Sequence, residues 1–326
     1  MNIPKLTPGE ITSLWNSYLT NTMTLWVTRH FIINTQDDKL RSILKYAEEI
    51  ALVEVEKSKN FLEEANHPLP QKFDAEDVDV NGPTLFTDNF ILLLKVVLSQ
   101  DALTVYALSL NSSTRSDIRQ FYADCTKNVS QLYNRLYDLM YEKGLHHPEL
   151  HIPIPKQIEK VSKQSFLAGW FSERRPLTSN EILQLEFNIR SIVVNKEVMR
   201  GFAQVTTSNK LKKYFQRGVE KNQKQLEVLQ SILTVNELPQ LPSWESEVTD
   251  ITVPPFSNRL MLYKVSMITG ATSGRYGAFL ASVLRKDLGV TTTRLMAEEL
   301  LYGEDGVNLM IENGYLDQLP LAREQK

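Results

Sequence analysis

Apolar residues recur at three- and four-residue spacing along residues 11–33, which predicts a long amphipathic helix near the start of the chain. The apolar positions of this stripe are Ile11, Leu14, Trp15, Tyr18, Leu25, Trp26, Ile32 and Ile33. Ahead of them, Thr7 and Glu10 stand at capping-box spacing, and Pro8 takes the first helical position. We therefore predict that the first helix begins directly after Thr7.

A second apolar stripe follows Asp37-Asp38 and ends where prolines interrupt the chain. Its inward residues are Leu40, Ile43, Leu44, Ala47, Ile50, Ala51, Phe61 and Leu62. Pro68 and Pro70 end the helix, because proline has no amide donor and clashes with the preceding turn. The stretch from Asn66 to Phe86 then shows no helical periodicity, so we predict a long crossover there.

Two further helices are predicted, from about Thr87 to Leu110 and from about Ser113 to Lys143. The seam of the fourth helix consists of Ile118, Tyr122, Cys125, Val129, Leu132, Leu136 and Leu139. Gly144 follows as a left-handed cap. Cys125 lies within the seam, so we expect it to pack as a small hydrophobe rather than act as a nucleophile.

The chain contains this pattern twice. Residues 6–11 return as 177–182, an offset of 177 − 6 = 171, and residues 139–144 return as 309–314, an offset of 309 − 139 = 170. Two matches at opposite ends of a module, at nearly one offset, indicate duplication of the whole module. Thr178 and Glu181 rebuild the capping box in the second copy.

The connection lengths predict the fold class. Short links between helices 1 and 2 and between helices 3 and 4 make antiparallel pairs, and a long link between helices 2 and 3 makes a crossover. We predict an all-α protein of two tandem ferritin-like four-helix bundles, each with this long crossover. The predicted domains are 1–157 for the first bundle and 177–326 for the second. Residues 158–176 form an apolar linker that we expect to dock on one bundle and fix the two modules relative to each other.

Composition narrows the class of function. The 36 basic and 39 acidic residues give a formal net charge of −3, which supplies no electrostatic reason to bind nucleic acid. The apolar stretch from Phe90 to Leu98 is interrupted by Lys95 and falls short of the ~20 residues that span a bilayer. Residues 1–6 lack the apolar core of a signal peptide. With Cys125 as the one cysteine, we expect a cytoplasmic protein without membrane insertion.

The di-metal chemistry of ferritin-like bundles has a defined ligand pattern, which this chain lacks. It requires a Glu from each of two helices and a Glu-x-x-His from each of the other two. The five histidines (His30, His67, His146, His147 and His151) all lie in the first copy. The one Glu-x-x-His, from Glu64 to His67, sits at a helix end beside Pro68. We predict no metal or other cofactor bound in this way.

A second metal pattern lies in the first crossover. Asp77-x-Asp79-x-Asn81-Gly82, with Asp88 at the twelfth position, follows the calcium-loop spacing except for its last residue. Pro83 replaces a position whose carbonyl should bind the ion. The second copy, aligned here, carries Val248, Asp250, Thr252 and Val253. We favour a solvated acidic crossover without a bound ion.

The remaining histidines do not form a shared site. His146, His147 and His151 could hold a transition metal, but the prolines among them (Pro148, Pro153 and Pro155) favour an extended strap along the bundle. His30 has Gly201 as its counterpart, and Cys125 has Leu295.

Some polar residues recur in both copies. Arg29 matches Arg200, and Arg115-x-Asp117 matches Arg285-x-Asp287. Residues two apart on a helix do not face each other, so we expect each Arg and Asp to reach a different neighbour. A structural ion-pair or capping network is favoured over a polar site inside each bundle. Gly270, Gly274 and Gly277 predict close helix packing, within the chain or between subunits.

The sequence resembles a known tandem family over its whole length. The residues that carry the resemblance are Phe166-Leu167-Ala168-Gly169-Trp170-Phe171, Arg175-Pro176-Leu177, Glu181-Ile182, Trp244, Glu247-Val248-Thr249-Asp250, Pro254-Pro255-Phe256-Ser257-Asn258, Tyr276-Gly277, Arg285-Lys286-Asp287-Leu288, Glu304-Asp305-Gly306 and Met310-Ile311-Glu312-Asn313-Gly314. They are similar to a bacterial family of unknown function found mainly in spore-forming Gram-positive bacteria. Its modules resemble ferritin-like bundles and spore coat protein F. The resemblance implies no activity and no catalytic residues, and Gln225 stands where it leads us to expect a histidine.

The expected function follows from these observations together. The chain contains no nucleophile elbow, phosphate-binding glycine loop, dinucleotide fingerprint or paired Cys-x-x-Cys. We expect a non-enzymatic structural or interaction protein that binds protein partners or itself, with the spore coat as the setting that the family implies. The alternative is a degenerate ferritin-like protein that binds a metal or small ligand within one bundle.

Overall fold

The computed structural model describes residues 5–146, 150–169, 174–242, 244 and 247–322, and within them it is helical without a β-strand. The first unit contains helices α1 (Pro8–Asn34), α2 (Asp38–Glu64), α3 (Asp88–Ser112) and α4 (Ser116–Glu142). The second contains α5 (Ser179–Val205), α6 (Asn209–Val235), α7 (Asn258–Ser282) and α8 (Lys286–Glu312). The predicted pair of tandem four-helix units is confirmed, and the four helix lengths repeat in order: 27, 27, 25 and 27 residues.

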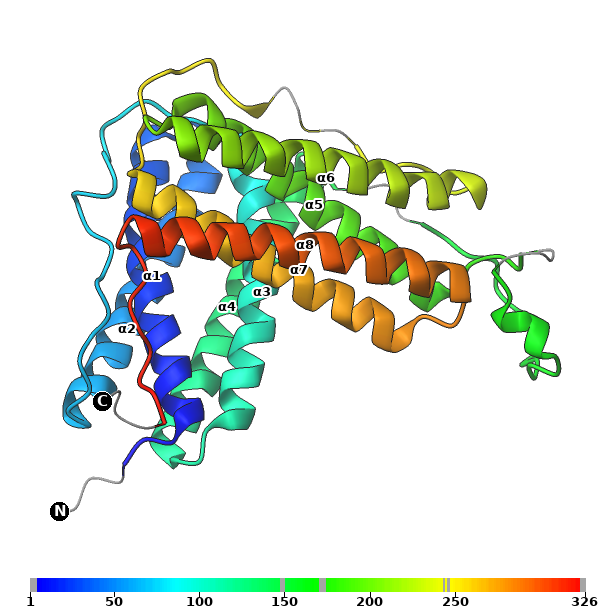
Figure 1. Ribbon diagram of the computed structural model, residues 1–326, viewed down its shortest axis with the longest axis horizontal. Coiled ribbons are helices and arrows are strands. Elements are labelled where there is room, and N and C mark those ends of the chain that lie inside the picture. The colour runs from blue at the N-terminus through cyan, green and yellow to red at the C-terminus, as the bar shows by residue number, and fades with distance from the viewer. Residues whose placement is uncertain (1–4, 147–149, 170–173, 243, 245–246, 323–326) are drawn as a thin grey trace.

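Each unit has one long crossover. In the first, α1 packs against α2, α3 against α4, α2 against α4 and α1 against α3. The carboxylate of Asp88 at the start of α3 accepts the amides of Gln36 and Asp37, which lie between α1 and α2. Because α2 ends at the opposite end of the unit, the chain must run the length of the bundle to reach α3 (Figure 1). This is the predicted crossover, and residues 236–257 repeat it between α6 and α7.

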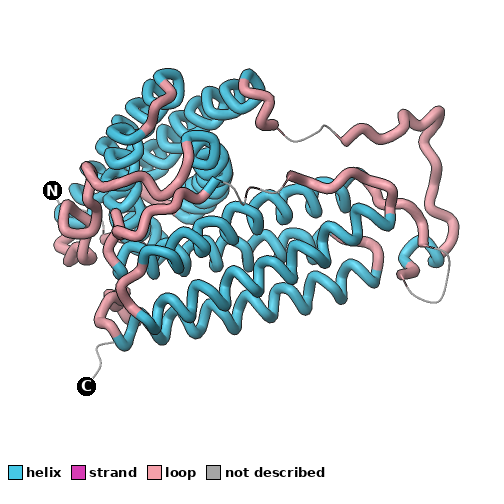
Figure 2. Tube along the Cα trace, turned by 90° about the horizontal axis from the view of Figure 1, so that it is seen from above, coloured by secondary structure: helices cyan, strands magenta, loops and turns pink. Residues whose placement is uncertain are grey.

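The helices of the second unit cross those of the first at a steep angle (Figures 1 and 2). One large cluster of buried apolar residues extends through both units, and a smaller cluster fills the far end of the first. Helix α3 contributes to both clusters, and residues 90–97 are all buried. By length and composition α3 could cross a membrane, and half of that apolar window is buried in the fold. Its apolarity follows from packing against its own unit and against α5 of the other.

Both predicted capping boxes are present, and each glutamate also caps a second helix. Glu10 accepts the amide of Thr7 at 2.8 Å and the amides of Thr114 and Arg115, ahead of α4, at 2.8 Å each. Burial alone would raise the pKa of Glu10, but these backbone donors outweigh it and lower the pKa to about 2. Glu181 repeats the arrangement, with the same lowered pKa of about 2. The two glutamates therefore tie the start of each unit to its fourth helix.

Glu10→Gln is expected to lower the free energy of unfolding by about 2 kcal/mol at pH 6, because hydrogen bonds to an ionised group are lost. The folded pKa lies below the unfolded value of 4.5, so the carboxylate stabilises the fold above that pH and ceases to do so as the pH falls toward 2. The deficit of the variant should therefore shrink between pH 4.5 and pH 3. Urea unfolding across this range measures it, with exposed Glu49→Gln as the control. A deficit that does not change with pH would contradict this assignment.

The segment between the units docks on the second unit. Residues 151–163 are exposed, and a short 3₁₀ turn follows at Gln164–Leu167. Arg175 donates to the carbonyl of Phe166, stacks on its ring at 4.1 Å and pairs with Glu181 at 2.8 and 2.9 Å. A Cβ on Gly169 would lie 2.4–2.6 Å from Asp287, so this position needs glycine. Trp170 and Phe171 of the predicted apolar linker lie outside the described residues.

Candidate functional site

The two crossovers pair with each other, and the pairing is reciprocal. Val78 forms an antiparallel bridge to Phe256, and Phe86 forms one to Val248. The starts of α3 and α7 are offset by 258 − 88 = 170. Applied to the crossover residues just ahead of these helices, this offset makes Val248 the counterpart of Val78 and Phe256 that of Phe86. A contact of one residue with another that is repeated with the partners exchanged is the signature of a twofold axis. The two units therefore meet as a pseudo-twofold pair joined in one chain.

The backbone hydrogen bonds between the crossovers follow the same symmetry. The four amide-to-carbonyl bonds are Asp79 to Pro255 (2.9 Å), Thr249 to Leu85 (3.0 Å), Ser257 to Asp77 (2.8 Å) and Thr87 to Glu247 (3.0 Å). This register corrects the sequence alignment, because Asp77 corresponds to Glu247 and not to Val248. The second crossover is one residue shorter (258 − 235 against 88 − 64), and the sequence did not reveal where that residue was lost.

Asp77 forms an ion pair with the second unit. Its carboxylate accepts the hydroxyl of Ser257 at 2.6 Å and the guanidinium of Arg259 at 2.6 and 3.3 Å. Arg259 also donates to the carbonyls of Gln71 at 3.1 Å and Lys72 at 2.7 Å. One arginine of the second unit thus holds both the side chain and the backbone of the first crossover.

The symmetry-related contact is weaker. Glu247 accepts the hydroxyl of Thr87, as Asp77 accepts that of Ser257. The counterpart of Arg259 there is Asn89 (259 − 170 = 89), so this position supplies no guanidinium to Glu247. The interface therefore has a reinforced side, where Asp77 binds Arg259, and a plain side, where Glu247 accepts a threonine hydroxyl.

The acidic residues of the first crossover do not converge on a common point. Asp79 accepts the amide of Asn81 at 3.1 Å, Asp88 holds the link between α1 and α2, and Asp77 binds Arg259. Across the described residues, no group of three or more His, Cys, Asp or Glu side chains is placed to hold a metal ion. The predicted solvated crossover is wrong for Asp77, which is buried because it lies between the units.

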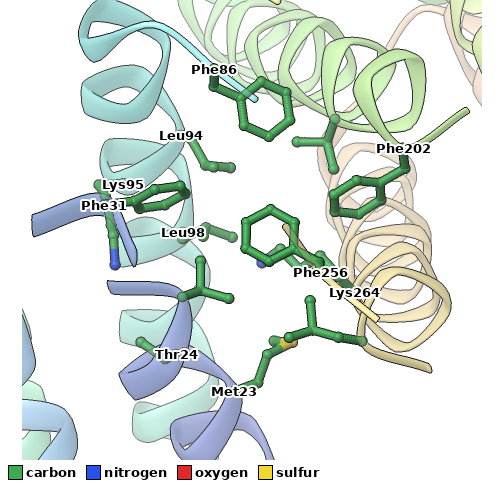
Figure 3. Close-up of a pocket in the computed structure, with 13 residues that line it drawn as sticks. Met23, Thr24, Phe31, Phe86, Leu94, Lys95, Leu98, Phe202, Phe256 and Lys264 are labelled. Atoms are coloured by element: carbon green, nitrogen blue, oxygen red, sulfur yellow. The ribbon is translucent and has the colours of Figure 1, made fainter. Parts of the chain in front are cut away.

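A small cavity lies where the units meet (Figure 3). Its walls include four pairs of equivalent residues from the two units: Val27 and Val198, Phe31 and Phe202, Phe86 and Phe256, and Leu94 and Lys264. The cavity therefore lies at the pseudo-twofold axis. The space open to a water-sized molecule is about 50 Å³, and a water needs roughly 10–15 Å³ of it. The cavity as it stands fits a few waters rather than an organic ligand.

Lys264 breaks the symmetry of this cavity, because its counterpart is Leu94. Burial lowers the pKa of Lys264 to about 8, and the nearby carboxylate of Asp101 opposes that shift. Asp101 itself pairs with the buried Arg275 of the second unit, so this ion pair also joins the units. Burial, together with the charge of Lys264, lowers the pKa of Lys95 to about 7. Lys95 donates to the hydroxyl of Thr28 at 2.6 Å and lies over the ring of Phe31 at 5.8 Å.

His30 and Gly201 occupy equivalent places beside the axis. The His30 Nδ1 lies 2.9 Å from the carbonyl of Asp79, and its ring meets that of Phe256 edge to face at 5.2 Å. A Cβ on Gly201 would lie 2.8 Å from Phe86. His30 therefore packs under one of the two equivalent phenylalanines, and glycine leaves room for the other.

One buried tyrosine in each unit, on its third helix, was missed in the sequence. Tyr106 on α3 donates to Glu54 on α2 at 2.6 Å, and Tyr276 on α7 donates to Gln225 on α6 at 2.9 Å. The available signal was the identity of Tyr106 and Tyr276 at an offset of 276 − 106 = 170. Gln225, where the family resemblance led us to expect histidine, is thus an acceptor in a bond that both units share.

Glu54 and Gln225 accept the two tyrosine hydroxyls, and exchanging these acceptor types tests the two hydrogen bonds. Burial raises the pKa of Glu54 to about 7, against the hydrogen bonds that favour its charged form. The folded pKa lies above the unfolded 4.5, so stability is complete below pH 4.5 and falls as the pH rises toward 7. Glu54→Gln should exceed the parent by about 2–3 kcal/mol at pH 8 and by less than about 1 kcal/mol at pH 5. Gln225→Glu should lose stability at pH 8. Urea unfolding at pH 5 and pH 8 measures these free energies. Equal effects of Glu54→Gln at the two pH values would contradict the raised pKa of Glu54.

The recurring Arg-x-Asp motifs correct a sequence expectation. In each motif the arginine pairs with its own aspartate, at 2.7 and 3.1 Å in both Arg115–Asp117 and Arg285–Asp287. The expectation that they reach different neighbours was wrong, because each arginine is the N-cap and has extended rather than helical backbone angles. The structural network favoured for them is confirmed.

The other recurring arginine makes a different contact in each unit. Arg29 pairs with Glu48 on α2 at 2.8 Å and lies over the ring of Trp26. Arg200 approaches Glu197 on its own helix at 3.4 Å. The counterpart of Glu48 is Val219 (48 + 171 = 219), so the second unit has no equivalent of the Arg29–Glu48 pair.

Three further predictions can be compared with the structure. Cys125 is buried, as expected from its seam position. His146 stacks on Tyr141 at 4.5 Å and His151 is exposed, whereas His147 lies outside the described residues. The expected close packing of Gly270, Gly274 and Gly277 within the chain is wrong: a Cβ at any of them would meet nothing within 4 Å.

Fold and interface together define a fused pair of four-helix units, and comparison with known proteins gives the family. A family model described as a protein of unknown function (DUF3231) matches residues 2–158 and again residues 165–326. The chain belongs to this family and carries its domain twice, which confirms the predicted tandem family. No curated protein matches the chain.

One solved structure is similar to part of the chain. It comes from Bacillus halodurans C-125 and is provisionally described as a spore coat protein. The match covers 46% of this chain and 98% of that one, with 16% identity and a TM-score of 0.42. A likeness at this level carries no argument about fold or function.

Proposed function

We propose that this protein is a non-enzymatic structural or interaction protein that serves as a rigid helical block in a protein assembly. The observation that carries the proposal is the reciprocal crossover pairing, which joins two four-helix units through backbone bonds and the Asp77–Arg259 ion pair. This reciprocal pairing of the crossovers fixes the two units relative to each other, and a building block of an assembly needs that rigidity. Four of the carboxylates described above have structural partners: Glu10 and Glu181 cap helices, and Asp77 and Asp101 form ion pairs across the interface.

The setting we propose is the sporulating cell. The support is the family resemblance set out in the sequence analysis, together with membership of the DUF3231 family. We propose that the protein is cytoplasmic when made and is recruited to the spore coat.

A fluorescent fusion at the native locus of a spore-forming host that encodes the protein tests this setting. The expected result is a signal that appears during sporulation and gathers at the surface of the developing spore. A signal present in growing cells and diffuse throughout sporulation would contradict it.

A second candidate is a ligand-binding protein with a site inside one unit. The observation that favours it is Glu54, which is buried beside the Cys125 thiol and has one carboxyl oxygen without a hydrogen-bond partner. Elemental analysis of untagged protein from cells supplied with iron, manganese, zinc and calcium separates the candidates. About one tightly held metal per chain, lost in Glu54→Gln, would favour the second candidate.

A further inference from the structure

Helix α8 carries an exposed apolar stripe. The stripe consists of Val290, Ala297, Leu300, Leu301, Val307 and Ile311, and all six side chains are exposed. Leu300 and Leu301 at its centre are 55% and 65% exposed. Val290, Ala297 and Ile311 keep the seven-residue spacing by which helices pack against each other, with Glu304 in the place between the last two, and Leu300 and Val307 also lie seven apart. In Figure 1 this helix lies on the near side of the second unit.

The first unit provides an internal control for this stripe. With the offset of 170, the counterparts on α4 are Gln120, Lys127, Ser130, Gln131, Tyr137 and Tyr141. The same helix in the same fold is therefore stable with polar and amphipathic residues in these places. The apolar residues of α8 are not needed to build a unit, and exposed contiguous apolar faces of this kind mark interaction sites.

The charges along α8 indicate which partner fits. Arg294 lies in the N-terminal half of the stripe, 61% exposed and 4.0 Å from Glu298. Glu304 lies exposed in the C-terminal half. If two α8 helices pack antiparallel about a point between Leu300 and Leu301, Val290 meets Ile311 of the other helix, since 290 + 311 = 300 + 301. Arg294 then lies within one turn of the other Glu304, whereas a parallel pair would place like charges side by side.

The neighbouring helix leaves room for such a contact. Gly303 of α8 lies against Thr269 of α7, and Gly270 and Gly274 follow on the open side of α7. Side chains are absent there, so another helix can approach closely. A face about 32 Å long, at 1.5 Å per residue, and two helices wide (about 20 Å) spans roughly 640 Å². This is close to the ~800 Å² per partner of a specific interface.

We propose that the α8 face binds a second copy of this chain, with two α8 helices packed antiparallel about a twofold axis at Leu300 and Leu301. This inference deepens the assembly role proposed above by naming its partner. The internal pseudo-dimer would then be the block, and the α8 contact would join two such blocks in a closed pair, because each chain has one α8 face.

Sedimentation velocity of the purified full chain over roughly 1–100 μM is the test. The expected result is a concentration-dependent dimer that is lost in the double variant Leu300→Ser, Leu301→Gln, which introduces the residues of the first unit. Both side chains are exposed, so circular dichroism should show an unchanged helical fold. Leu108→Ser, which changes another exposed leucine on α3, should leave the dimer intact.

A charge exchange gives a second readout. Arg294→Glu should raise the dissociation constant of the dimer about tenfold, equivalent to about 1.4 kcal/mol, and adding Glu304→Arg should restore it. A wild-type chain that stays monomeric, or a dimer that the leucine variant does not weaken, would overturn the proposal. The wild-type chain could prove monomeric and still reach the spore surface. If the leucine variant then failed to reach it, the α8 face would bind a different protein. The proposed function would then stand without this partner.

Discussion

Asp77→Ala is expected to lower the free energy of unfolding of the full chain by about 3–4 kcal/mol, in the range found when one partner of a buried ion pair is removed. The substitution leaves the guanidinium of Arg259 buried without its carboxylate, at the point where the second unit holds the first crossover. It also removes the acceptor of the Ser257 hydroxyl. Urea unfolding followed by circular dichroism measures the change.

The duplication supplies the matched control for this variant. Glu247→Ala removes the symmetry-related carboxylate, which accepts a threonine hydroxyl and has Asn89 in the place equivalent to Arg259. Its expected effect is about 1 kcal/mol, the net value of one hydrogen bond. Losses of equal size in Asp77→Ala and Glu247→Ala would show that Arg259 adds nothing to the interface, and the reinforced side would have to be abandoned.

Arg285→Ala is expected to cost about 3 kcal/mol, whereas Arg115→Ala should cost about 1 kcal/mol. The two arginines make the same pair with an aspartate, but Arg285 is 2% exposed and Asp287 12%, against 11% for Arg115 and 52% for Asp117. Arg285 also donates to the carbonyl of Arg175, at 3.2 Å, and thereby holds the segment that docks on the second unit. The same motif should therefore matter more where it is buried.

Thermal and urea unfolding of both variants measure this difference. Both variants keep the aspartate and the helix that follows it, so they differ chiefly in the burial of the broken pair. A larger loss for Arg115→Ala than for Arg285→Ala would contradict the assignment.

The helices could be predicted because their signals are local. The three- and four-residue periodicity, the capping boxes at Thr7 and Thr178, and the glycines at 144 and 314 each act within a few residues of the chain. Both glycines adopt a positive φ of 66°, as a left-handed cap requires. Duplication strengthened these predictions, since each copy supported the assignment made in the other.

The interface could not be predicted, because its contacts join residues far apart in the chain. Nothing near Asp77 in the sequence indicates that Arg259 will reach it, and its acidic neighbours suggested an ion-binding loop instead. Inside the units, a polar contact could be found only by aligning both of its partners between the copies. Tyr106 aligns with Tyr276, and their acceptors Glu54 and Gln225 align with each other. The prediction for the Arg-x-Asp motifs was wrong for a different reason. A rule for residues within a helix was applied to arginines that are N-caps.

Hydrogen exchange at the crossover amides tests the pseudo-twofold pairing most directly. The amides of Asp79, Thr87, Thr249 and Ser257 donate the four bonds between the crossovers, although all four lie outside helices. We expect all four amides to be protected to a similar degree, close to the helix-core amides, and we expect Asp77→Ala to reduce their protection together. Exchange at the rate of open loops, while the helical amides of both units stay protected, would show that the units are not joined in this way.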